Sequence, residues 1–79
     1  MKVEVEISIH DDNNFLIHTE DEVIISYRND SWFSYKDERA KVLEIHPEYM
    51  VLDGLGEAYY KNIEKLVQVK EKIKNFPYF

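Results

Sequence analysis

A hairpin pattern at residues 23–33 constrains the fold of this chain more than any other feature of its sequence. The β-branched run at residues 23–25 leads to a polar turn at residues 28–31, and the aromatic residues Trp32 and Phe33 follow the turn directly. β-Branched and aromatic residues on both sides of a short polar turn are typical of two antiparallel strands. We therefore predict a β-hairpin here, of the kind from which small β-barrels are built.

The rest of the chain repeats this alternation of strand and turn signals. Between Lys2 and Ile9 polar and apolar residues alternate strictly, which predicts one half-buried antiparallel strand. Pro47 marks a turn because proline cannot donate to a strand ladder, and the only two glycines, Gly54 and Gly56, predict a tight turn with positive φ. Strands are predicted at residues 2–9, 23–28, 39–46, 49–53 and 57–61, and residues 15–17 are predicted to pair back onto the first strand.

Residues 57–76 permit two interpretations. Tyr59, Ile63 and Leu66 are spaced so that they line one face of a long helix. Val67 and Val69, however, alternate with polar residues and are β-branched, which favours a strand. We predict one helical turn at residues 62–65, a strand at residues 66–70 and a short helical or frayed tail, with a continuous helix as the alternative.

These elements predict a mainly β fold, a small antiparallel SH3-like barrel of five or six strands with a short C-terminal helical turn or tail. A chain of 79 residues is long enough for one small domain, so we assign residues 1–79 to a single β-barrel domain. The hydrophobic fraction of 44% and the aromatic fraction of 14% are sufficient for a packed interior. The predicted core consists of Val5, Ile7, Val23, Ile25, Val42, Ile45, Val51, Leu52, Ile63 and Leu66.

Composition also bears on the cellular setting. The chain contains no cysteine, whereas secreted domains of this size usually carry disulfides. Its first residues are charged, and no apolar run approaches the length that crossing a bilayer requires. We therefore expect a cytoplasmic protein that has no signal peptide and does not contact the membrane.

The sequence lacks the residue patterns that catalysis and metal binding commonly require. His10, His18 and His46 have no metal-ligand spacing, and each falls at a predicted strand end where a structural role is expected. There is no glycine-flanked serine and no phosphate-binding glycine loop. The acidic groups at residues 11–12 and 20–22 lack the spacing of a calcium loop, which favours solvated turns over a cation site. We predict a protein that is not an enzyme and uses no metal or cofactor.

The most promising surface residues are aromatic. Tyr27, Trp32, Phe33 and Tyr35 gather around the predicted hairpin turn. Because side chains alternate along a strand, Phe33 and Tyr35 are expected on one face and Trp32 on the other, so the three cannot all be core. Partly exposed aromatic residues serve as anchors for a partner. The alternative is that they cover the end of the barrel and pack against the aromatic tail at residues 76–79.

Four short elements between residues 23 and 70 form a further pattern. They are Tyr27-x-x-Asp30-Ser31-Trp32, Ala40-x-Val42-x-x-Ile45, Met50-Val51-Leu52-Asp53 and Tyr60-x-x-Ile63-x-x-Leu66-x-x-Val69. This pattern resembles the C-terminal barrel of YolD-like proteins, small proteins of Gram-positive bacteria and their phages; Ser31 departs from it, because the family usually has glycine there. The resemblance implies a small barrel without assigned catalytic residues that is associated with Y-family translesion polymerases in a regulatory role.

Together these observations predict a non-enzymatic protein-interaction module. We expect it to dock on a larger bacterial or phage protein through an aromatic rim or an open sheet edge. One alternative is a barrel that binds single-stranded nucleic acid by stacking bases on Trp32 and Tyr35, with the lysines after residue 60 holding phosphates. The net charge of −6 disfavours that alternative, because 14 of the 16 acidic residues lie in residues 1–60. A second alternative is an acidic DNA mimic that inhibits another protein.

Overall fold

The chain folds into two antiparallel β-sheets, as the computed structural model shows for the residues that it describes, 1–4, 8–30 and 33–70. The smaller sheet pairs β1 (Lys2–Glu4) with β2 (Ser8–His10). The larger sheet consists of β3 (Glu22–Arg28), β4 (Ser34–Ile45), β5 (Tyr49–Leu52), β6 (Gly56–Tyr59) and β7 (Ile63–Gln68). One 3₁₀ turn, η1 (Tyr60–Asn62), connects β6 to β7. The predicted mainly β, antiparallel fold is confirmed.

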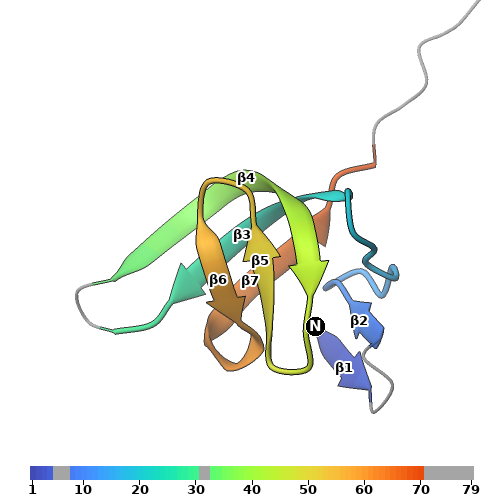
Figure 1. Cartoon of the computed structure of the whole chain (residues 1–79), viewed down its shortest axis with the longest axis horizontal. Helices are drawn as coiled ribbons and strands as arrows, with labels where there is room; N and C mark the ends of the chain where they lie inside the picture. The colour runs from blue at the N-terminus through green and yellow to red at the C-terminus, as the bar shows by residue number, and fades with distance from the viewer. Residues whose placement is uncertain (5–7, 31–32, 71–79) are drawn as a thin grey trace, which may run out of the picture.

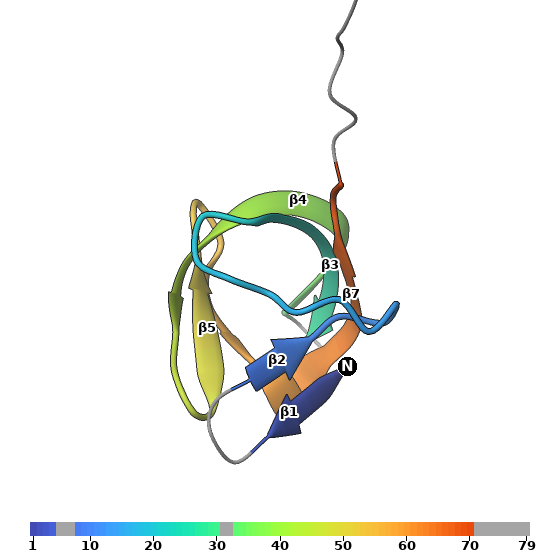
Figure 2. The same ribbon diagram turned by 90° about the vertical axis from the view of Figure 1, so that its right-hand side faces the viewer.

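The five strands of the larger sheet follow the order β6-β5-β4-β3-β7 (Figure 1). Figure 2 shows that this sheet curls on itself, and that β1 and β2 lie across one end of the curl. Among the described residues β6 and β7 do not pair, so the curled sheet is not closed by hydrogen bonds between its end strands. The distal parts of β3 and β4 project beyond the other strands, at the left of Figure 1.

Extra residues in β4 and β7 bend the sheet where this projection begins. Just before the Tyr27–Tyr35 pair, Ser26 of β3 stands opposite two residues of β4, one of which is Asp37 with a φ of 53°. β7 carries its own extra residue, Glu64, beside the same point of β3. Such bulges bend a strand and increase its twist. They allow the β3–β4 hairpin to lean away from the curl while it remains paired.

The core lies inside the curl and is built from alternate residues of the strands. Seven of the ten predicted core residues belong to the core cluster or pack against it, and Val5 and Ile7 lie outside the described residues. The prediction for Val51 is wrong because Val51 and Leu52 are neighbours on one strand, and neighbours point to opposite faces. Leu52 is buried together with Met50, and Val51 is partly exposed. Fully buried are Val23, Ile25, Val42, Leu52 and Leu66, while Ile45 and Ile63 pack partly buried against them.

The N-terminal segment does not form the single strand that was predicted for residues 2–9. Its alternating residues divide between β1 and β2, which pair with each other antiparallel so that Val3 stands opposite Ile9. The chain then turns back a second time, and the Ile17 amide donates to the Ile9 carbonyl at 2.8 Å, as predicted for a short pairing of residues 15–17. Ile9 and Ile17 are both buried in the core cluster. β2 and the segment that follows it therefore supply core side chains at the end of the curl.

The C-terminal part follows the strand interpretation as far as it is described. A continuous helix over residues 57–76 is excluded because residues 57–70 contain the end of β6, η1 and β7. The helical turn begins two residues earlier than predicted, at Tyr60, and β7 begins at Ile63 instead of residue 66. Gly54 and Gly56 have φ values of 84° and 82°, so the predicted positive φ is found at both glycines. The predicted tail lies outside the described residues.

Candidate binding surfaces

Three of the four predicted site residues meet on the projecting hairpin, in a group that we call the hairpin aromatic cluster: Tyr27, Phe33 and Tyr35. The rings of Tyr27 and Tyr35 are stacked, with centroids 5.3 Å apart and an interplanar angle of 17°. Phe33 meets both rings edge-on, at 6.2 Å from each. Phe33 is 40% exposed whereas Tyr27 is 2% exposed, so Tyr27 supports the cluster from inside and Phe33 presents it to solvent. The fourth predicted residue, Trp32, lies outside the described residues.

The bulge beside Ser26 positions this cluster. The Asp37 amide donates to the Ser26 hydroxyl at 2.9 Å, and the Lys65 ammonium donates to the Asp37 carboxylate at 2.8 Å. This hydrogen bond from Lys65 holds the pKa of Asp37 below its usual value. Three strands are thus tied together at the base of the hairpin, and Tyr35 is brought opposite Tyr27.

A shallow groove of about 450 Å³ runs beside the cluster. Its rim includes an ion pair in which the Arg28 guanidinium nitrogen lies 3.2 Å from the Glu64 carboxylate. Both partners of that pair are more than half exposed, so water screens it strongly. The groove combines ring surfaces with charges of both signs. Its lining residues are Ser26, Tyr27, Arg28, Ser34, Tyr35, Lys36 and Glu64.

The two stacked tyrosines have different hydrogen bonding. The Tyr27 hydroxyl accepts a hydrogen bond from the Tyr59 amide at 3.3 Å and so links β3 to β6 across the inside of the curl. The Tyr35 hydroxyl is buried and has no hydrogen-bond partner among the described residues. Burial raises the pKa of Tyr35 to about 12. The Tyr27 hydroxyl thus bridges β3 and β6, two strands that are not neighbours in the sheet, while the Tyr35 hydroxyl makes no such link within the described part of the chain.

A second aromatic surface, which we call the tyrosine strip, was not predicted from the sequence: His46, Tyr49 and Tyr59. The rings of His46 and Tyr49 are stacked at 4.6 Å, and the Tyr49 and Tyr59 rings are 5.2 Å apart. Tyr49 and Tyr59 are partners across β5 and β6. This pairing could have been predicted, because Tyr49 and Tyr59 lie at similar distances in sequence before and after the glycine turn that joins β5 to β6.

A groove of about 470 Å³ lies next to the tyrosine strip and is lined by Pro47, Glu48, Tyr59, Tyr60 and Lys61. Tyr60 fixes this region, because its hydroxyl donates to the His46 carbonyl at 2.6 Å and also lies 2.9 Å from the Tyr49 carbonyl oxygen. Burial raises the pKa of Tyr60 to about 12. The β4–β5 turn is therefore held against η1 by a buried phenol.

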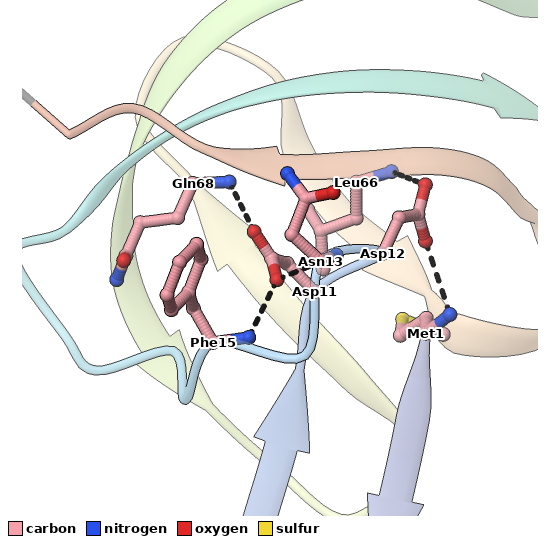
Figure 3. Close-up of polar contacts among 7 residues, drawn as sticks. All are labelled: Met1, Asp11, Asp12, Asn13, Phe15, Leu66 and Gln68. Carbon is pink, nitrogen blue, oxygen red and sulfur yellow. Dashed lines mark hydrogen bonds and ion pairs between the residues drawn. The ribbon is translucent and has the colours of Figure 1, made fainter.

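The acidic pair that follows β2 forms a structural contact, which we call the Asp11–Asp12 clasp (Figure 3). Asp11 is 3% exposed, and its carboxylate accepts hydrogen bonds from the amides of Asn13, Phe15 and Gln68 at 3.0, 2.8 and 2.7 Å. The Asp12 carboxylate accepts the Leu66 amide at 3.0 Å, and the Asp12 amide donates to the Leu66 carbonyl at 2.8 Å. The expectation that this pair is a solvated turn is wrong for Asp11, which is buried and fully engaged.

Further charged and polar groups around the clasp add contacts to it. Partial burial raises the pKa of Asp12, but the hydrogen bond from the Leu66 amide and the Met1 ammonium group at 3.0 Å together hold it below its usual value. The Gln68 side-chain amide donates to the Leu16 carbonyl at 3.2 Å and to the Asp21 carboxylate at 2.6 Å. Residues 11–21 are therefore attached to β7 by a series of polar contacts.

Other chemistry considered from the sequence finds little support in the geometry. In residues 1–4, 8–30 and 33–70 no three His, Cys, Asp or Glu side chains are grouped so as to hold a metal ion. Two of the described lysines after residue 60 are engaged: Lys65 with Asp37, and Lys70, whose ammonium lies 4.3 Å from the centre of the Phe15 ring. No helix in the described part of the chain has the length and apolar character needed to cross a membrane.

The fold and these surfaces define a small antiparallel β domain with two aromatic patches and a sealed sheet edge. The chain was compared with models of known protein families, with curated proteins and with solved structures, and none of them matches it.

Proposed function

We propose that this chain is a non-enzymatic protein-interaction module that docks through the hairpin aromatic cluster. The observation that carries the proposal is the position of Phe33, whose ring is 40% exposed on a projecting hairpin and is held edge-on by two tyrosines. An aromatic side chain that is already ordered loses little conformational entropy on binding. Such rings are frequent hot spots of protein interfaces.

The proposed partner is a larger bacterial or phage protein. The resemblance to YolD-like proteins suggests a translesion polymerase, on which this chain would act as a regulatory subunit. The groove beside Phe33 supports a protein as partner, because ring surfaces next to charges of both signs match the composition of protein interfaces. The proposed location is the cytoplasm.

The two alternative functions receive less support from the described contacts. For nucleic acid, the Lys65 ammonium is neutralised by Asp37, and Lys70 lies over an aromatic ring. For a DNA mimic, acidic residues on the sheet alternate with basic partners, as in the pair in which Arg39 lies 2.9 Å from Glu22. Interleaved charges do not reproduce the continuous negative charge of a phosphate backbone.

The test compares Phe33→Ala with Leu43→Ala in affinity capture from cells that make the protein naturally. Leu43 is the matched control, because it is also a large apolar residue that is 40% exposed, but it lies far along β4 from the cluster. We expect proteins that are retained by the parent and by Leu43→Ala to be lost with Phe33→Ala, while both variants melt within a few degrees of the parent. Equal capture by the two variants would reject the cluster as the docking surface. Salt-sensitive binding of single-stranded DNA by the parent would instead favour the nucleic-acid function.

A further inference from the structure

The tyrosine strip lies on the outer face of the curled sheet. Met50 of β5 and Ala58 of β6 are buried in the core, so by alternation the side chains of Tyr49 and Tyr59 point away from it. Both tyrosines are partly exposed. The Tyr49 ring contacts the rings of both His46 and Tyr59, and Tyr59 in turn lines the groove of about 470 Å³. Tyr59 is therefore the ring through which the strip reaches the groove.

The backbone around this groove is fixed by hydrogen bonds within the chain. The buried Tyr60 hydroxyl bonds to the carbonyls of His46 and Tyr49, at the two ends of the β4–β5 turn. The Tyr60 amide donates to the Glu48 carbonyl at 3.1 Å, which holds the same turn against η1. A partner that enters the groove therefore meets a surface that is already ordered, and ordering it costs little on binding.

Carboxylates surround the tyrosine strip. The Tyr59 hydroxyl donates to the Glu57 carboxylate at 3.2 Å, and the negative charge of Glu57 raises the pKa of Tyr59. The Glu44 carboxylate lies 2.7 Å from Nε2 of His46, at the other end of the strip. Glu48 is exposed and lines the groove itself. The aromatic surface is thus bordered by three negative charges.

We propose that the groove beside the tyrosine strip binds an arginine side chain from an extended segment of a partner protein. A guanidinium group is planar, so it can stack on the Tyr59 ring and donate to the Glu48 carboxylate at the same time, whereas an ammonium group lacks this planar fork. Lys61 is the only basic residue among the described residues that line the groove. The three carboxylates therefore leave its surroundings negative and complementary to a cation. This surface is separate from the hairpin aromatic cluster and does not depend on the docking proposed for it.

The test follows peptide binding to the full, isotope-labelled chain by nuclear magnetic resonance. The probes are two end-blocked peptides of equal length and charge, one alternating glycine with arginine and the other alternating glycine with lysine. We expect the arginine peptide to shift the backbone amide signals of Glu48, Tyr59 and Lys61. We also expect it to bind about twofold to fivefold more tightly than the lysine peptide.

Two pairs of variants separate the stacking contact from the charge. Tyr59→Leu keeps an apolar side chain but loses the ring, and should weaken binding of the arginine peptide by about twofold to fivefold. Tyr59→Phe keeps the ring and should bind as the parent does. Glu48→Gln removes the acceptor charge and should also weaken binding by about twofold to fivefold. Its matched control is Glu38→Gln, which removes the same charge from an exposed position of β4 nearer the hairpin and should leave the affinity unchanged.

Four results would overturn the proposal. Equal weakening by Glu48→Gln and Glu38→Gln would show that the peptide is held by the net charge of the chain. Equal affinity for the arginine and lysine peptides, or parent affinity in Tyr59→Leu, would exclude stacking of a guanidinium group. A neutral glycine–proline peptide that shifts the same amides with equal affinity would assign the groove to apolar ligands. Shifts at these amides that depend on chain concentration without peptide would assign it to a second copy. If Tyr59→Leu does not fold, the comparison of Glu48→Gln with Glu38→Gln decides.

Discussion

The two stacked tyrosines of the hairpin aromatic cluster provide a matched test of the fold. Tyr27→Phe and Tyr35→Phe each remove one hydroxyl group and leave the ring, so the 5.3 Å stacking contact is retained in both. The Tyr27 hydroxyl accepts the Tyr59 amide across the inside of the curl, whereas the Tyr35 hydroxyl is buried without a partner among the described residues. We expect the first variant to be destabilised and the second to be unchanged or stabilised.

The magnitudes follow from the two environments. Tyr27→Phe leaves the Tyr59 amide without its acceptor, which costs about 1–2 kcal/mol, in the lower part of the usual range because the bond is long at 3.3 Å. Tyr35→Phe removes a buried hydroxyl that has no partner among the described residues, so the free energy of unfolding should rise by about 0–1 kcal/mol. The two variants should therefore differ by about 2 kcal/mol.

Urea unfolding, followed by circular dichroism, measures this difference. For a domain of this size the slope of the free energy with urea is about 1 kcal/mol/M, so the two midpoints should be separated by about 2 M. Equal loss of stability in Tyr27→Phe and Tyr35→Phe would refute the reasoning, because it would show that the hydroxyl of Tyr35 is satisfied in the folded chain. A Tyr27→Phe variant as stable as the parent would show that the bridge to Tyr59 does not contribute.

Three further outcomes follow from the structure. Asp12, Glu22 and Asp37 have folded-state pKa values below their usual ones. The stability that these carboxylates contribute is therefore complete above about pH 5 and is lost as the pH falls below about 4. Thermal melts at falling pH should show this decline, and a constant Tm would contradict it. Gly56→Ala places a Cβ at a φ of 82° and should cost about 1–2 kcal/mol in urea unfolding, although the space around it is open. Tyr60, whose pKa is raised to about 12, should remain neutral in the folded chain when ordinary tyrosines ionise near pH 10, and an absorbance titration that shows no such delayed group would contradict its burial.

Local patterns predicted the middle of the fold well. In β3 the residues Val23 and Ile25 are buried as their spacing requires, because one face of this strand points into the core. The glycine turn was predicted because positive φ is open to few other residues. Phe33 and Tyr35 share one face, as alternation along the strand requires, and their rings are in edge contact.

In the N-terminal segment the alternation of polar and apolar residues did not predict the correct strands. Alternation reports which side chains share a face, but a hairpin and a single long strand have the same period. Residues 2–9 contain no glycine, proline, asparagine or aspartate that would mark a turn, so the return of the chain between β1 and β2 left no signal. The adjacent Val51 and Leu52 were both placed in the core, although alternation allows only one of them.

The Asp11–Asp12 clasp could not be predicted from the sequence, for a different reason. Asp11 and Gln68 are 57 residues apart, and nothing in the sequence around either residue points to the other. A pair of aspartates after a strand has the appearance of an ordinary solvated turn. It becomes a structural contact because the curl of the sheet brings β7 alongside the segment that follows β2 (Figures 2 and 3). The register shifts in β4 and β7 that accompany this bent sheet are not marked by any local pattern in the sequence.

The proposal that the hairpin aromatic cluster docks a partner protein is tested most directly by photo-crosslinking in living cells. Phe33 is replaced by p-benzoylphenylalanine, and the same replacement at Leu43, which is equally exposed on β4, provides the control. Irradiation at position 33 should give one discrete product of higher mass that is absent or much weaker at position 43. No product at position 33, or the same products in equal yield at both positions, would contradict the proposed function.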